Sequence, residues 1–135
     1  MSGFNLFVYG TLRSGMPAHE RLAGCAKITD ASVQGTLYDI DGRFTALLPY
    51  GSDVVEGEVW RCPAELLPVL DEYEGTRAGV FRRIGAEVAT RGGDRFPCWL
   101  YAAGPALSRW LTPDHRIRPV PSVRRGADAQ PTGTH

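Results

Sequence analysis

Short runs of alternating apolar and polar residues dominate this chain and restrict it to a fold built mainly of β-strands. The first run, Phe4 to Tyr9, alternates and is rich in residues that favour strands. Further runs of this kind cover residues 32–40, 44–48, 54–60, 80–90 and 96–101. Arg91-Gly92-Gly93-Asp94 separates the last two runs and predicts a hairpin loop.

Leu66 to Glu74 is the main stretch with apolar residues at helical spacing. Cys62-Pro63-Ala64-Glu65 before it is typical of a helix start, because proline suits the first turn and an acid suits the helix dipole. Pro68 removes a backbone donor, so we expect a distorted first turn or a later start. Gly75 is a fitting end, and residues 18–22 predict a short helix. Together these segments predict an α+β fold with a small curved or closed sheet.

The length of 135 residues suits one domain, which we assign to residues 1–112. From Pro113 onward the chain is rich in Pro, Arg, Gly and Ala and has no periodicity. We therefore expect residues 113–135 to form a mobile tail that is partly draped on the domain.

The charge balance and the apolar runs bear on partners and location. Fifteen basic residues balance fifteen acidic ones, which gives no electrostatic reason to expect nucleic acid or an anionic membrane as partner. No apolar run is long enough to span a bilayer, and the first residues have neither the basic start nor the apolar core of a signal peptide. We therefore expect a cytoplasmic protein.

The cysteines and histidines predict no metal site. The 3 cysteines are widely spaced, which fits neither a disulfide framework nor a zinc pattern, and the 3 histidines are scattered as well. Free thiols in a reducing cytosol are the simplest interpretation.

Glu74 is an acid on the apolar face of the predicted helix. At about 100° per residue it falls on the same side as Leu67 and Leu70, whereas Glu72 falls on the opposite side. Burial of a carboxyl raises its pKa towards neutrality, which suits a group that accepts and donates a proton. The alternative interpretation is structural: Glu74 turns outward at the helix end, or pairs with an arginine such as Arg77 or Arg83.

The second unusual feature is the turn at Tyr9-Gly10-Thr11-Leu12-Arg13. A strand that stops at a glycine can turn sharply and leave successive backbone N–H groups free to hold a carboxylate or an oxyanion. The alternative is an ordinary turn between a strand and a loop.

These two stretches, taken in order, resemble the γ-glutamylcyclotransferase-like (AIG2-like) family. The first is Phe7-Val8-Tyr9-Gly10-Thr11-Leu12-Arg13, and the second is Leu70-Asp71-Glu72-Tyr73-Glu74-Gly75. Val55-Glu56-Gly57-Glu58-Val59-Trp60 and Phe81-Arg82-Arg83 also match the rhythm of the family. The resemblance covers roughly residues 4–101.

The resemblance implies a small mixed β-barrel with short helices and a cavity at one end. The Tyr9–Leu12 turn would bind the α-carboxylate of a γ-glutamyl group, and Glu74 would be the general acid/base. A small γ-glutamyl amine or peptide would then be converted into 5-oxoproline and a free amine, without a metal or a cofactor. The α-amino group of the substrate is itself the nucleophile in this chemistry, so no Ser–His or Cys–His pair is required.

The family pattern adds two candidates for substrate binding. Arg83 matches a recurrent arginine that could orient a carboxylate, although a structural ion pair explains it equally well. Tyr101 ends a predicted strand, where it could line the cavity or serve as a core or rim aromatic residue.

The chain also departs from the family pattern. Many relatives have Tyr-Pro-Ala where this chain has Phe44-Thr45-Ala46, and many have Tyr in place of Phe81. These changes affect the expected contacts of the amine half of the substrate. Two alternatives to a cyclotransferase therefore stay open: a non-catalytic module that binds a small carboxylate, and removal of a γ-glutamyl group from a natural product. Retention of Glu74 favours catalysis. The oligomeric state is not fixed by the sequence.

Overall fold

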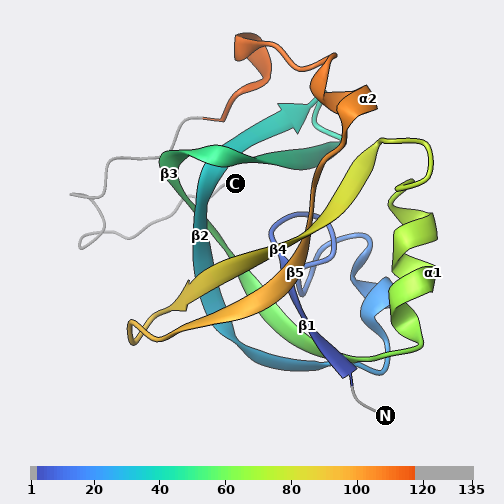
Figure 1. The fold of residues 1–135 in the computed structure, drawn as a ribbon, viewed down its shortest axis with the longest axis vertical. Helices are drawn as coiled ribbons and strands as arrows, with labels where there is room; N and C mark the ends of the chain where they lie inside the picture. The colour runs from blue at the N-terminus through green and yellow to red at the C-terminus, as the bar shows by residue number, and fades with distance from the viewer. Residues whose placement is uncertain (1–2, 118–135) are drawn as a thin grey trace.

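Five strands form one closed barrel in the computed structural model, which describes residues 3–117 (Figure 1). Their bounds are β1 Gly3–Val8, β2 Ala26–Ile40, β3 Phe44–Pro63, β4 Phe81–Thr90 and β5 Arg95–Ala103. The order around the barrel is β1-β3-β2-β4-β5. The pairs are antiparallel except for β1 and β5, which run parallel, with Leu6 opposite Trp99, and close the ring. The predicted small mixed β-barrel is confirmed.

Short helical segments lie beside the barrel: η1 His19–Leu22, α1 Leu66–Tyr73, α2 Pro105–Ser108 and η2 Pro113–His115. The α1 helix begins after the expected Cys62-Pro63 start, because β3 continues through Pro63. Pro68 lies in the first turn of α1, where a backbone N–H has no intrahelical partner, so it does not break the helix.

The end of α1 has the geometry that the sequence predicted. Gly75 has a φ of 70°, its N–H donates to the Glu72 carbonyl, and the Thr76 N–H donates to the Asp71 carbonyl. This pair of bonds is the Schellman motif, which needs a residue in the left-handed region and so favours glycine. The helix therefore ends at Tyr73, and Glu74 is its C-terminal cap residue.

The prediction of separate strands at residues 44–48 and 54–60 is wrong, because both segments belong to the single long strand β3. Pairing with β2 continues on both sides of a register shift at Gly35/Thr36, where the Thr36 hydroxyl donates to the Tyr50 carbonyl at 2.8 Å. Gly51, with a φ of 101°, lets the chain bend there without ending the strand. The β2 strand begins at Ala26, six residues before the predicted start at residue 32. Its first residues are mostly polar and do not alternate, but they pair with β3.

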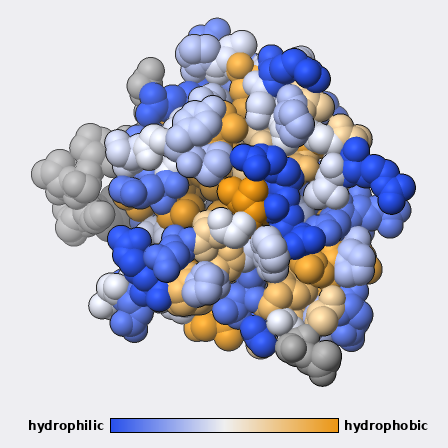
Figure 2. All heavy atoms as spheres, viewed as in Figure 1, coloured by the Kyte–Doolittle hydropathy of each residue, from blue (hydrophilic) through white to orange (hydrophobic). Residues whose placement is uncertain are grey.

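The first strand is buried on both faces, which ties the barrel to its helices. Phe7 faces the barrel interior with Val59, whereas Leu6 and Val8 belong to a second cluster with Leu70 of α1. Figure 1 shows α1 beside the barrel, next to the segment that contains η1. On the face drawn in Figure 2, hydrophobic side chains reach the surface in patches that hydrophilic ones interrupt.

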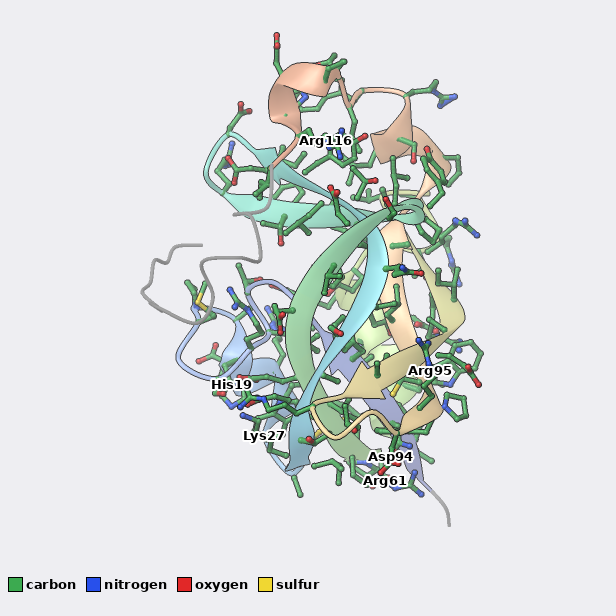
Figure 3. The ribbon with its side chains drawn as sticks, turned by 90° about the vertical axis from the view of Figure 1, so that its left-hand side faces the viewer. His19, Lys27, Arg61, Asp94, Arg95 and Arg116 are labelled. Atoms are coloured by element: carbon green, nitrogen blue, oxygen red, sulfur yellow. The ribbon has the colours of Figure 1, made fainter. Side chains whose placement is uncertain are left out.

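Residues 113–117, the first part of the predicted tail, lie against β2 and β3. The Arg116 guanidinium pairs with Asp53 at 2.8 Å, and the Ile117 N–H donates to the Leu37 carbonyl at 2.8 Å. Figure 3 shows Arg116 at the opposite end of the molecule from Arg61. Residues 118–135, which hold the rest of the predicted tail, lie outside the described residues, and the boundary at 112 stays a prediction. None of the helices within residues 3–117 is long and apolar enough to cross a membrane.

Candidate active site

A cavity of about 540 Å³ lies between the turn that follows β1 and the C-terminal end of α1. All four residues of the Tyr9–Leu12 turn line it, together with Glu74 and Tyr101. The two stretches singled out in the sequence therefore meet at one site, although the chain forms two long strands between them. Arg83 is not among the residues that line this cavity.

The Glu74 side chain lines the cavity without a bonding partner. Within residues 3–117 its carboxylate makes neither a hydrogen bond nor an ion pair, and Arg83 pairs with Asp71 instead. Burial raises the pKa of Glu74 from its ordinary value of 4.5 to about 7. Its charge also raises the pKa values of Tyr9 and Tyr101, as a minor contribution beside their burial, which is consistent with its closeness to both rings. Glu74 can therefore exchange a proton near neutral pH.

The Tyr9–Leu12 turn directs its carbonyl groups into the protein and leaves amide groups free. The Thr11 carbonyl accepts from the Ala18 N–H at 3.0 Å, and the Leu12 carbonyl is bonded to His19 Nδ1 at 2.8 Å. In the described part of the chain, the N–H groups of Gly10, Thr11 and Leu12 have no acceptor. Free successive amides beside a cavity can hold an anionic group of a ligand.

Glu58 anchors the loop that follows this turn. Its carboxylate accepts hydrogen bonds from the Ser14 N–H at 2.9 Å, the Ser14 hydroxyl at 2.7 Å and the Trp60 indole at 3.1 Å. Partial burial opposes ionisation, but these bonds and Lys27 together lower the pKa of Glu58. His19 packs on the Trp60 ring, and Figure 3 shows it on the same side of the molecule as Lys27. The sequence did not reveal this anchoring contact, because Ser14 and Glu58 are 44 positions apart.

The hydroxyl groups of Tyr9 and Tyr101 are used inside the protein. Tyr9 donates to the Tyr101 carbonyl at 2.5 Å and accepts from the Leu47 N–H at 3.1 Å. The Tyr101 hydroxyl donates to Asp71 at 2.7 Å. Burial is the main reason why both phenols have a raised pKa. Both residues therefore offer ring surface to the cavity, while their hydroxyls fix the barrel and α1.

Asp71 binds Arg83 through both carboxylate oxygens, at 2.8 and 3.0 Å. The guanidinium also lies 4.3 Å from the centre of the Trp99 ring. Arg83, followed by the Tyr101 hydroxyl, holds the pKa of Asp71 below its ordinary value. These contacts match the structural alternative for Arg83, and its role in substrate binding stays a prediction without a place in the cavity.

Thr45, which belongs to one of the stretches that depart from the family pattern, contributes a polar group beside the cavity. Its Oγ1 is buried, lies beside the cavity and has no hydrogen-bond partner among the described residues. A Cβ added to Gly10 would lie 2.6 Å from this oxygen, so a side chain at position 10 would force the Thr45 hydroxyl to move.

Within residues 3–117 no group of three or more His, Cys, Asp or Glu side chains is placed to hold a metal ion. A site that works without a cofactor stays a prediction.

Comparisons with known proteins identify the family of this chain. A family model described as "Gamma-glutamyl cyclotransferase, AIG2-like" matches residues 6–121. The chain is 34% identical over 103 residues to a Niallia circulans protein named "Gamma-L-glutamyl-butirosin B gamma-glutamyl cyclotransferase"; the match covers 72% of this chain and 65% of that relative's length.

Several solved structures are similar to this chain in fold. One described as "Gamma-glutamyl cyclotransferase" has a TM-score of 0.65 at 25% identity, over 76% of this chain and 67% of the other. An AIG2-like protein from Mus musculus has a TM-score of 0.70 at 20% identity, with both chains covered over 100% of their length, and supports the fold alone.

Proposed function

Because this chain belongs to the gamma-glutamyl cyclotransferase, AIG2-like family, we propose that it is an enzyme that acts on a γ-glutamyl amine or peptide. It releases 5-oxoproline and a free amine by intramolecular aminolysis, with Glu74 as the general acid and base. The substrate is a small molecule, and the residues named below bind it without a cofactor.

The observation that carries this proposal is the position of Glu74. A carboxyl with a pKa of about 7 faces the same cavity as the free amides of Gly10, Thr11 and Leu12. The amides offer donors for the α-carboxylate of a γ-glutamyl group. A substrate held in this way presents its α-amino group and its γ-carbonyl inside the cavity, where they can reach near-attack geometry.

The reaction then needs one group that both accepts and donates a proton. Glu74 takes a proton from the α-ammonium group, and the freed amine attacks the γ-carbonyl carbon to form the new C–N bond. The bond from that carbon to the leaving nitrogen breaks as Glu74 returns the proton to this nitrogen. The attacking nitrogen gives its second proton to the same leaving group, so that 5-oxoproline keeps one N–H and the amine departs as an ammonium ion. No water is consumed and Glu74 ends in its starting state. A pKa near the working pH suits both halves of this exchange.

The proposal is tested by detecting 5-oxoproline across a panel of γ-glutamyl amino acids, γ-glutamyl-ε-lysine and glutathione. We expect turnover of at least one compound, and a fall in kcat of roughly 100- to 10,000-fold in Glu74→Gln. Glu72→Gln is the matched control, because Glu72 is exposed two residues away on the same helix. Full activity in Glu74→Gln would exclude this mechanism.

Two other functions remain as alternatives. The name of the Niallia circulans relative favours a natural product that carries a γ-glutamyl group, so a butirosin-type compound belongs in the panel. A module that only binds a small carboxylate is disfavoured by Glu74, because such a module gains nothing from an unpaired acid in its cavity. Binding without turnover of any panel member would support the module instead of the enzyme.

A further inference from the structure

Exposure divides the residues that line the cavity into an inner wall and a mouth. The inner wall includes the buried residues Tyr9 and Leu12, the first and last residues of the Tyr9–Leu12 turn. The charged residues at the mouth are exposed: Glu20 and Arg21 of η1, and Arg43 at the turn between β2 and β3. The mouth therefore carries two positive charges and one negative charge.

The two arginines of the mouth are available to a ligand. The Arg21 guanidinium lies 4.0 Å from the centre of the Tyr73 ring, next to Glu74 in the chain. Stacking uses the flat face of a guanidinium and leaves the N–H groups at its edge free. Within residues 3–117 neither Arg21 nor Arg43 forms an ion pair, and neither does Glu20.

We infer that Arg21 and Arg43 recognise a carboxylate on the leaving amine, so that the preferred substrate is a γ-glutamyl compound whose amine half is anionic. This inference rests on the proposed function, which places the γ-glutamyl half against the inner wall. The amine half, which varies between substrates, must then extend towards the mouth. There it meets two guanidinium groups, each able to bind a carboxylate through paired N–H donors.

Charge also excludes the opposite kind of substrate. An amine half with extra positive charge is repelled by Arg21 and Arg43, and Glu20 offers only one compensating acid. Because the mouth is exposed, solvent and salt weaken these interactions. We expect a preference of about tenfold at low ionic strength, falling towards unity as salt is added.

The test compares two substrates of nearly equal size, γ-glutamyl-alanine and γ-glutamyl-alaninamide, which differ in the carboxylate. In the wild-type protein we expect kcat/KM to be about tenfold higher for the acid than for the amide. The double variant Arg21→Gln/Arg43→Gln should lose this preference while keeping its activity on the amide. The control Arg95→Gln/Arg109→Gln, an equal charge change at two exposed positions that do not line the cavity, should keep it. γ-Glutamyl-1,4-diaminobutane should be the poorest of the three substrates.

Several outcomes would overturn the inference. One is equal kcat/KM for acid and amide in the wild type, and another is a preference that survives in the double variant. Equal losses on both substrates would mean that the arginines bind the shared γ-glutamyl half. If nothing is turned over, the proposed function fails and calorimetric binding decides the inference alone. Tighter binding of the acid, lost in the double variant, would then support it, and equal binding would refute it.

Discussion

Asp71 and Glu74 lie three residues apart at the end of α1, yet the protein treats the two acids in opposite ways. Asp71 accepts two hydrogen bonds from Arg83 and one from Tyr101, and these bonds lower its pKa. Glu74 has no partner within residues 3–117, and burial raises its pKa to about 7. One helix end therefore supplies a fixed charge and a free proton carrier.

The difference shows how the fold makes a reactive carboxyl tolerable. Asp71 links α1 to β4 and β5 through Arg83 and Tyr101, so the helix end that carries Glu74 is held against the barrel. The hydrogen-bonded Asp71 supplies the rigidity. Glu74, which has no partner within residues 3–117, keeps a proton affinity that a salt bridge would remove. Each prediction below tests this division of roles.

The largest expected effect is the opposite pH dependence of the two acids. The folded pKa of Glu74 is raised, so its stabilising contribution is complete below its ordinary value of 4.5 and is lost as pH rises through about 7. The folded pKa of Asp71 is lowered, so its contribution is present above its ordinary value and is lost only as pH falls below it. Between pH 5 and 8 the Glu74 effect therefore acts alone.

Wild-type protein should lose about 3 kcal/mol of unfolding free energy relative to Glu74→Gln between pH 5 and pH 8. Urea denaturation of both proteins at the two pH values measures this, because other titrating groups cancel in the difference. Glu72→Gln should show no such change. A constant difference between wild type and Glu74→Gln would mean that the Glu74 carboxyl is solvated.

The next effect concerns the placement of the free acid. Glu74→Asp keeps the charge but withdraws the carboxyl from the cavity by one methylene group, and we expect kcat to fall about 100-fold with little change in stability. Glu72→Asp makes the same change on the exposed side and should leave kcat unaltered. Steady-state assays of 5-oxoproline release test the pair. An active Glu74→Asp would show that position matters less than charge.

Removing the charge of Asp71 should lower the stability of the protein more than it slows proton transfer by Glu74. Asp71→Asn removes the charge that binds Arg83 and should cost about 2 kcal/mol of unfolding free energy, since hydrogen bonds to charged groups are lost at a partly buried site. Asp94→Asn, in the exposed loop between β4 and β5, is the matched control. Chemical denaturation of the two variants measures the difference. Equal small losses would indicate that solvent compensates the Asp71 pair.

Much of this arrangement could be predicted from the sequence, because it follows from local patterns. Alternation located most of the strands, and Gly75 marked the end of α1 through its left-handed backbone. The spacing of Glu74 from Leu67 and Leu70 placed the acid on the buried face of the helix. These predictions depend on residues close together in the chain, where the geometry of a helix or a strand is fixed.

The partners of the charged residues could not be predicted in this way. The sequence left Arg83 free to pair with any acid near the end of α1, and only the packing of β4 against the helix selects Asp71. The role of Glu58 depends on a loop that returns to it across 44 positions of sequence. The unbroken β3 strand likewise depends on its pairing with β2, which overrides the turn residues near Gly51.

The smallest expected effect concerns Tyr101, which lines the cavity with Glu74 and also binds Asp71. Its ring lines the cavity and its hydroxyl donates to Asp71, so Tyr101→Phe should remove one hydrogen bond from the fixed acid and leave the wall intact. We expect a loss of about 1 kcal/mol in unfolding free energy and a kcat within a few-fold of wild type. Denaturation and turnover measured on the same preparation separate the two effects. A large fall in kcat with unchanged stability would mean that the hydroxyl leaves Asp71 to contact the substrate. Tyr101 would then act with Glu74 on the substrate and not with Asp71 in the structure.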